Sequence, residues 1–245
     1  MANPVLEFKN VSKTFGSLTA IKDLSFVVRP GEIYGLIGPN GSGKTTTLKM
    51  IAGLYRPTEG SVLVQGYDVV EASTKSKEHI GYVSDEPNAY DRLTGREFLQ
   101  FVGELFGMDR TLRDARIEEL LGEFGIHDLA GALFGGYSRG TKQKMSIIAA
   151  FLHEPELILI DEPMVGLDPA SARTVKKMLS DYAKDGGAVL LSTHTLPIAD
   201  EICDKYGVLK EGVLDVEGTK KQLLRRAKLE GGSLEDIYMA LTATV

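Results

Sequence analysis

A glycine-rich segment carries the residue types that bind phosphate groups. It consists of Gly38, Pro39, Asn40, Gly41, Ser42, Gly43, Lys44, Thr45 and Thr46. Glycines allow backbone N–H groups to turn toward phosphate oxygens, and a helix that starts there adds the partial positive charge of its N-terminus. We expect Lys44 to contact the β- and γ-phosphates of a nucleotide and the Thr45 hydroxyl to ligate Mg²⁺. A chance glycine turn is disfavoured, because a strand and a helix are expected on either side.

Two carboxylates follow a continuous apolar run later in the chain. The run at residues 157–160 ends in Asp161 and Glu162. Such a run is typical of a strand buried on both faces of a parallel sheet, and ligands collect at the carboxyl ends of these strands. We expect Asp161 to hold Mg²⁺ through water, and Glu162 to orient and deprotonate an attacking water. A strand end with an acidic helix cap is the alternative for an isolated motif.

The order of apolar runs predicts the elements that position these groups. Alternating or apolar runs predict strands at residues 5–8, 24–28, 32–37, 61–65, 80–83, 157–160 and 188–192. Helices are expected at 45–54, at 170–183 and after residue 218. From Thr94 to His153 the pattern is helical only, and it begins with a capping box at Thr94 and Glu97. The chain is therefore predicted to be α/β, with an antiparallel β-subdomain and a helical subdomain.

Composition excludes several classes of protein. The chain has 245 residues, 43% of them hydrophobic, a single cysteine and a net charge of -6, which excludes disorder and a disulfide scaffold. No apolar stretch approaches the ~20 residues that span a bilayer, and no signal peptide is visible. The acidic balance disfavours nucleic acid as the main partner. The histidines show no metal-ligand spacing, so no structural metal is expected.

A second candidate anion site narrows the choice among phosphate-loop proteins. Ser138 is well placed to cap a helix that begins with Arg139, Gly140 and Thr141. Farther along lie the segments 166–169, Gly-Leu-Asp-Pro, and 192–194, Ser-Thr-His. With these motifs in this order, the chain from residue 5 to about residue 218 resembles the ATP-binding subunits of ABC transporters.

The resemblance implies a role for each matching residue. In a head-to-tail dimer, Ser138 and Gly140 would contact the γ-phosphate of the partner's ATP, and Asp168 would couple the two sites. His194 would hydrogen-bond the γ-phosphate and position the water, and Phe15 would stack on adenine. Without the motifs, a structural histidine and a core phenylalanine would be the favoured interpretations.

The chain departs from the common family pattern at several positions. Asp85 stands where most members have a Gln that contacts Mg²⁺, and its shorter, charged side chain makes direct ligation doubtful. Arg139 and Thr141 replace a Gly and the Gln of the signature. These departures favour an exporter-like relative. Met164 replaces a usual Thr, and no direct chemistry is assigned to it.

The expected function is that of an ATP-hydrolysing motor that uses ATP and Mg²⁺ and drives transport through a separate membrane permease. Its partners would be that permease and a second ATP-binding subunit. The pair of ATP-binding subunits would be a homodimer by default, with a heterodimer as the alternative. It would lie at the cytoplasmic face of the membrane, with a groove around residues 85–93 receiving a permease helix.

Two other function classes are kept. The first is an ABC-type ATPase that acts on DNA or ribosomes, which usually has two ATPase modules or a long coiled coil, and neither is expected in this sequence. The second is a phosphate-loop kinase, which has no reason to carry the helix that begins after Ser138.

The predicted boundaries are an ATPase domain over 1–220, with its helical subdomain near 91–153, and a helical tail over 221–245. The basic cluster at 220–228 is expected to be a solvated helix face rather than a lipid contact. For the last helix, at 233–241, packing on the chain's own core is favoured over docking to a partner.

Overall fold

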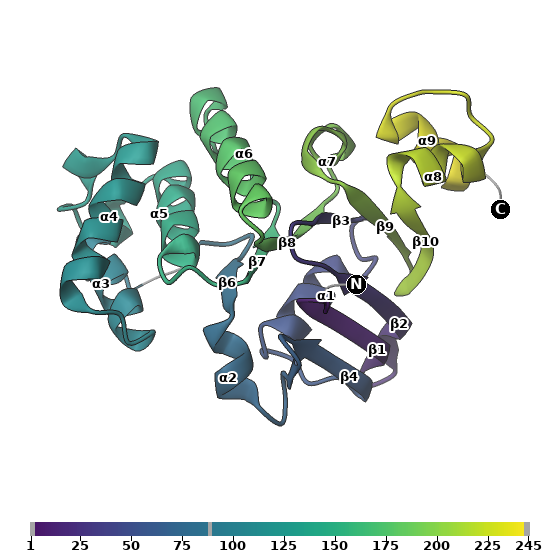
Figure 1. The fold of residues 1–245 in the computed structure, drawn as a ribbon, viewed down its shortest axis with the longest axis horizontal. Coiled ribbons are helices and arrows are strands. Elements are labelled where there is room, and N and C mark those ends of the chain that lie inside the picture. The colour runs from purple at the N-terminus through teal and green to yellow at the C-terminus, as the bar shows by residue number, and fades with distance from the viewer. Residues whose placement is uncertain (1–2, 88–89, 243–245) are drawn as a thin grey trace.

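The structure is a computed structural model that describes residues 3–87 and 90–242. The predicted boundaries at residues 1 and 245 and part of the predicted groove segment, 88–89, lie outside the described residues. Figure 1 shows helices α3, α4 and α5 gathered at one end of the molecule and α8 and α9 at the opposite end, with the sheets between them. The predicted α/β class is confirmed.

The central sheet has six strands in the order β10-β9-β3-β8-β7-β6. Its strands are β3 (Ile33–Ile37), β6 (Ile80–Val83), β7 (Leu157–Asp161), β8 (Ala188–Thr193), β9 (Lys205–Lys210) and β10 (Val213–Thr219). All pairs are parallel except β9 with β10. Every residue of β3, β7 and β8 is buried, because helices and a second sheet cover both faces.

A second, antiparallel sheet has the order β2-β1-β4-β5. It consists of β1 (Leu6–Phe15), β2 (Leu18–Val28), β4 (Glu59–Val64) and β5 (Tyr67–Asp68). Its apolar face packs with α1 against one face of the central sheet, in a cluster that includes Leu6, Phe26, Leu48 and Leu159. The opposite face of the central sheet, with Ile158 and Leu191, packs on α4, α5 and α6.

Nine α-helices lie within the described residues. They are α1 (Lys44–Ile51), α2 (Ser73–Glu78), α3 (Gly95–Leu105), α4 (Arg110–Phe124), α5 (Arg139–Phe151), α6 (Pro169–Lys184), α7 (Leu196–Ile202), α8 (Lys220–Ala227) and α9 (Leu234–Thr242). The capping box predicted at Thr94 and Glu97 begins α3. None of the helices in the described part of the chain combines the length and the apolar character needed to cross a bilayer.

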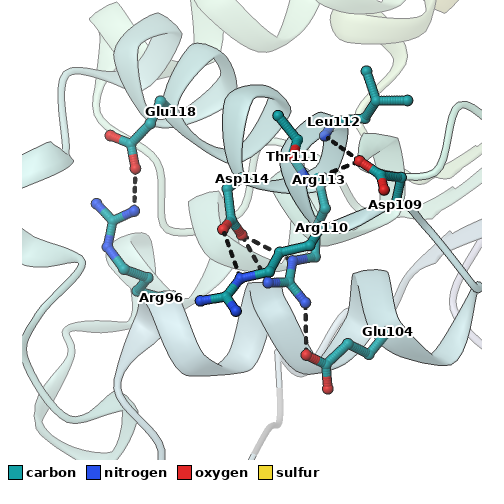
Figure 2. A network of polar contacts seen from close by, with 9 residues as sticks. All are labelled: Arg96, Glu104, Asp109, Arg110, Thr111, Leu112, Arg113, Asp114 and Glu118. Carbon is teal, nitrogen blue, oxygen red and sulfur yellow. Dashed lines mark hydrogen bonds and ion pairs between the residues drawn. The ribbon is translucent and has the colours of Figure 1, made fainter.

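Ion pairs hold α3 and α4 together at the end of the molecule (Figure 2). The Arg113 side chain is 5% exposed, and its guanidinium donates to Glu104 on α3 at 2.6 Å and to its neighbour Asp114 at 2.9 Å. Arg96 and Glu118 form a second link between the same helices. Asp109 caps α4 by accepting hydrogen bonds from two backbone N–H groups. The apolar stem of Arg113 lies against Gly103, so α3 and α4 meet closely.

The structure corrects some of the predicted elements. The helix expected at 45–54 ends at Ile51, and the first two strands are longer than expected. Helix α7 and the β9–β10 hairpin were not predicted, because their runs are short and contain polar residues. The last helix packs on its own chain, since Leu234 and Ile237 are buried in a cluster with Tyr206 and Leu223. This packing confirms the prediction that the last helix packs on the core of its own chain.

Strand β6 and helix α5 touch backbone to backbone at Gly81. A Cβ atom at this position would lie 2.2 Å from the carbonyl oxygen of Ala150 and 2.7 Å from the Ile158 side chain. The carbonyl belongs to α5 and cannot rotate away without breaking the helix. The absence of a side chain at residue 81 therefore sets the distance between the strand and the helix.

We expect Gly81→Ala to lower the free energy of unfolding by roughly 1–3 kcal/mol, because overpacking of a well-packed contact forces the backbone to shift. The matched control is Gly131→Ala, where an added Cβ meets nothing within 4 Å and the backbone is not left-handed. Urea unfolding of both variants measures the difference. Equal stability of the two variants would show that β6 and α5 separate freely.

Candidate nucleotide-binding and hydrolysis site

Four neighbouring parallel strands end at one edge of the central sheet. Their registers pair Ile37 with Thr193, Asp161 with Ser192, and Val83 with Ile160. The segments that follow these strands therefore lie together, as expected for the carboxyl edge of a parallel sheet. They surround a cavity of about 590 Å³.

Most of the predicted site residues line this cavity. They are Phe15, Asn40, Gly41, Gly43, Lys44, Thr45, Thr46, Asp85, Asp161, Glu162 and His194. Gly38, Pro39 and Ser42 belong to the same loop without lining the cavity, and Ser42 is buried. The structure thus brings together predicted residues from five separate segments of the chain.

The glycine-rich loop leads directly into α1, whose first residue is Lys44. The Lys44 ammonium donates to the carbonyl oxygens of Gly38 at 2.8 Å and Pro39 at 3.0 Å. Burial lowers the pKa of Lys44, and the carboxylates of Glu162 and Asp161 oppose this shift. Because the first turn of α1 has no acidic residue, the positive end of its dipole is open to an anion.

Asp161 lies at the end of β7 and is 1% exposed. The Thr45 hydroxyl donates to its Oδ2 at 2.8 Å. Burial raises the pKa of Asp161, the hydrogen bond from Thr45 lowers it, and the charges of Asp85 and Glu162 raise it further. The ionised carboxylate is therefore held at an energetic cost in the folded chain.

The donor atoms of this corner fit Mg²⁺. A hydroxyl and a carboxylate are the hard oxygen ligands that Mg²⁺ takes from proteins, with the remaining positions left to phosphate oxygens and water. Within residues 3–87 and 90–242 no group of three His, Cys, Asp or Glu side chains is arranged to hold a metal alone. Asp85 lines the cavity, but its Oδ1 accepts from the backbone N–H of Glu86 at 3.0 Å.

Glu162 follows Asp161 and its carboxylate accepts three hydrogen bonds. The donors are the Thr193 hydroxyl at 2.9 Å, the His194 backbone N–H at 2.9 Å and His194 Nδ1 at 2.5 Å. Glu162 has a φ of 50°, a left-handed conformation that is strained for a side chain of this kind. The strained backbone turns Glu162 toward the end of β8, where His194 lies.

Phe15 also lines the cavity and is 40% exposed. The Tyr55 ring meets it edge-on, with centroids 5.2 Å apart, and the Lys13 ammonium lies 4.7 Å from its centroid. Neither Lys13 nor Tyr55 was predicted. The Phe15 ring is thus accessible to a ligand and is contacted by Tyr55 and Lys13, and it is not part of the core.

The second predicted anion site lies away from this cavity. Ser138 caps α5 by accepting from the Thr141 N–H at 3.2 Å. Asp168 caps α6 and pairs with Lys144 of α5 at 3.2 Å. Hydrogen bonds from Ser171 lower the pKa of Asp168, and Lys144 lowers it further.

Gly140 lies against the carbonyl of Gly166, since an added Cβ would come within 2.6 Å of that oxygen. The starts of α5 and α6 therefore form one continuous surface.

Sequence reasoning missed four residues that line the cavity. They are Leu18, Thr19, Ala20 and Glu211. The first three lie at the start of β2, which extends beyond the predicted strand. Glu211 lies at the tip of the β9–β10 hairpin, and the signal for that turn was the Glu-Gly pair between two strand-like runs.

Comparisons with known proteins agree with this geometry. Residues 21–165 match the family profile described as ABC transporter. The ABC transporter ATP-binding protein NatA of Bacillus subtilis is 35% identical over 222 residues, which cover 90% of this chain and 89% of NatA.

Solved structures show the same fold. The ATP-binding subunit of an ABC transporter superposes with a TM-score of 0.94 at 34% identity, covering 97% of this chain and 99% of that one. The bacterial ABC transporter cassette MJ0796, solved as a dimer, has a TM-score of 0.81 at 27% identity, covering 87% of this chain and 98% of the cassette. It was also solved as a dimer in a post-hydrolysis state bound to ADP and Pi, with a TM-score of 0.80. The chain belongs to the ABC transporter family and is one of its ATP-binding subunits, an ATPase.

Proposed function

We propose that this chain hydrolyses MgATP in the cavity at the end of the parallel strands, as the motor of an exporter-like transporter. The observation that carries the proposal is the meeting of Lys44, Thr45, Asp161, Glu162 and His194 in one cavity. These residues supply a phosphate-binding cation, oxygen ligands for Mg²⁺ and a base beside the expected γ-phosphate. Phosphoryl transfer requires little more than this positioning and charge stabilisation.

The nucleotide would lie along the cavity from Phe15 to His194. Adenine would stack on the Phe15 ring, and the loop from Gly38 to Thr46 would surround the phosphates. Thr45 would ligate Mg²⁺ directly and Asp161 would hold it through water. When bound, Mg²⁺ neutralises charge on the phosphates and on the carboxylates around Thr45. Asp85 would act through its charge, because its carboxylate is turned to its own loop.

Glu162 would accept the proton of the water whose oxygen attacks the γ-phosphorus, with ADP as the leaving group. In the structure its carboxylate is occupied by Thr193 and His194. A phosphate oxygen only accepts hydrogen bonds. His194 must therefore carry a second proton, on Nε2, if it is to bind the γ-phosphate while Nδ1 stays on Glu162. Otherwise its ring leaves Glu162, which frees that carboxylate for the water.

The surface formed by Ser138, Gly140 and Asp168 would complete the site of a second subunit. It does not line the chain's own cavity, and Ser138 and Gly140 lie at a helix N-terminus, where backbone N–H groups favour an anion. Closure of two subunits around ATP would place Ser138 and Gly140 against the γ-phosphate of the ATP that the partner binds. Asp168 would then lie between the two ATP sites. The dimeric cassette MJ0796 supports this arrangement. A homodimer is the default, since closed symmetric pairs are the commonest assemblies.

An apolar groove between the core and the helical region would receive the permease; its described lining lies beside, and not within, the segment 85–93 where the groove was predicted. Its volume is about 390 Å³, and its lining includes Leu54, Tyr82, Phe98, Val102 and Phe106. Leu54 is 59% exposed, which is unusual for a large apolar side chain beside others of its kind. The subunit would sit on the cytoplasmic face of the membrane. The exporter-like assignment is supported by Asp85, Arg139 and Thr141, which depart from the commonest family pattern.

We expect Glu162→Gln to slow ATP hydrolysis by roughly 10²- to 10⁴-fold and to leave ATP binding intact, because a general base is lost without loss of a phosphate contact. Phosphate release should be measured on the chain alone and on the complex purified with its membrane subunit. The control is Glu71→Gln, an exposed carboxylate outside the cavity. Unchanged turnover in Glu162→Gln would refute the role of this residue.

We expect Asp161→Asn to abolish hydrolysis and yet to raise the Tm of the nucleotide-free chain at neutral pH. Burial raises the pKa of Asp161 in the folded chain, so its ionised form destabilises the fold. This loss grows as the pH rises above the usual aspartate pKa of about 4. A gain of roughly 1 kcal/mol corresponds to about 2–4 °C for a chain of this size.

Thermal unfolding between pH 4 and pH 8 tests the sign of this effect. The difference in Tm between Asp161→Asn and the parent should be larger at pH 8 than at pH 4, with the change confined to the range between the usual aspartate pKa and the raised pKa of the folded chain, whereas exposed Asp215→Asn should show no such trend. A variant less stable than its parent at every pH would contradict the account.

We expect Leu54→Asp to prevent recovery of the permease when the tagged chain is isolated from its native membranes in detergent. The substitution removes an apolar side chain that would pack on the permease, and the new carboxylate would have to give up water on docking, so docking would carry a desolvation penalty. Leu112→Asp is the matched control, because Leu112 is 70% exposed on α4 and does not line the groove. Both variants should bind ATP equally.

Equal recovery of the membrane protein by both variants would refute docking at the groove. Recovery of ribosomes or DNA-repair proteins by the parent, with no membrane protein, would move the chain to the soluble branch of the family.

A further inference from the structure

The tip of the β9–β10 hairpin reaches the nucleotide cavity. Lys210 and Val213 pair across the two strands, which leaves Glu211 and Gly212 as a two-residue turn. Their φ angles are 49° and 78°. Positive values at both positions define a type I′ turn, which favours Asn or Asp followed by Gly. Glu211 is an unusual residue for such a position, and it lines the cavity.

Backbone contacts hold the turn against the phosphate-binding loop. The Gly212 N–H donates to the carbonyl of Ser42 at 3.0 Å, and the Lys22 N–H donates to the carbonyl of Gly212 at 2.9 Å. A Cβ at residue 212 would lie 2.6 Å from the carbonyl oxygen of Ala20. The turn is therefore tied both to the loop and to the start of β2. The position of Glu211 relative to the cavity is set by these contacts.

The Glu211 carboxylate has no counter-charge in the described part of the chain. It is exposed, and no other described residue donates a hydrogen bond to it or forms an ion pair with it. By contrast, Asp161 and Glu162 are hydrogen-bonded in the same cavity. Burial lowers the pKa of Lys44, and the carboxylates that oppose this shift are Glu162 and Asp161, not Glu211. Among the carboxylates that line the cavity, Glu211 is the one to which no described residue donates a hydrogen bond.

The chemistry of a nucleotide limits what a carboxylate can bind. Phosphate oxygens are acceptors and carry negative charge, so an ionised carboxylate repels them. The donors of ATP are the hydroxyl groups of its sugar and the exocyclic amino group of adenine. Both belong to the nucleoside, which is the part of the ligand that Phe15, Leu18 and Ala20 would contact in this cavity.

We propose that Glu211 is a specificity-determining residue that accepts a hydrogen bond from a donor of the nucleoside, either a sugar hydroxyl or the adenine amino group. This inference rests on the proposed function, because it requires ATP to occupy the cavity. A carboxylate beside the nucleoside favours a ligand that carries the donor over an analogue that lacks it, since the charge-assisted hydrogen bond is lost with the analogue. The hairpin fixes the backbone of Glu211, so its carboxylate stays within reach of the cavity.

The test compares the binding of three nucleotides to the full chain by calorimetry. The probes are ATP, 2′-deoxy-ATP and inosine triphosphate, with EDTA present so that no turnover takes place. The variants are Glu211→Gly, which relieves the left-handed turn, and Glu211→Gln, which keeps the length but removes the charge. Asp215→Ala is the control, because Asp215 is an exposed carboxylate of the same hairpin that does not line the cavity.

The parent should bind ATP about 10-fold more tightly than one of the two analogues, as expected for a hydrogen bond to a charged group. Glu211→Gly should weaken ATP binding to the level of that analogue and abolish the difference, and Glu211→Gln should lie between. Loss of discrimination against 2′-deoxy-ATP identifies the sugar as the donor. Loss of discrimination against inosine triphosphate identifies the adenine amino group.

Other results would overturn the inference. If the parent binds all three nucleotides equally, or if both Glu211 variants keep its discrimination, Glu211 has no role in specificity. If Glu211→Gly binds all three more tightly, the carboxylate only repels the phosphates. A parent that binds no ATP at all would instead refute the proposed function, which is a distinguishable outcome.

Discussion

The parallel register of β3, β8, β7 and β6 is the constraint on which the rest of the structure depends. Because neighbouring strands run in the same direction, residues that end these strands meet at one edge, although they lie far apart in sequence. Lys44, Glu162 and His194 therefore come from three different strand ends. The helices and the second sheet cover both faces of the strands, and this burial keeps the edge in register.

The same edge concentrates charge that the fold alone would not favour. Asp85, Asp161 and Glu162 line the same cavity as Lys44, and the charges of Asp161 and Glu162 act on its ammonium group. Burial disfavours the ionised form of Asp161 and also of Lys44, and Glu162 occupies a strained backbone conformation. Residues of this kind persist where a ligand or a metal offsets their cost. The cavity is thus better suited to its ligands than to the stability of the empty chain.

Local patterns were sufficient for much of the fold and most of the cavity. The glycine-rich loop, the Asp-Glu pair at the end of β7 and the capping box at Thr94 are each defined by residues close together in the sequence, with a physical reason for their order. Glu211 and Tyr55 could not be found in this way, because they reach the site only through the pairing of β9 with β3 and the packing of Tyr55 on Phe15. Nor did local pattern reveal that Glu162 and His194 contact each other directly, since 32 positions separate them.

The contact at Gly81 has a mechanical consequence. A layer of side chains between a strand and a helix is compressible, because rotamers can change when the two elements are pushed together. No such layer separates β6 from α5 at Gly81 and Ala150. The apolar groove is lined by both residues, and α5 begins beside Ser138. A displacement of β6 at the groove should therefore move α5 with it, because no side chains lie between them at this contact to absorb the movement.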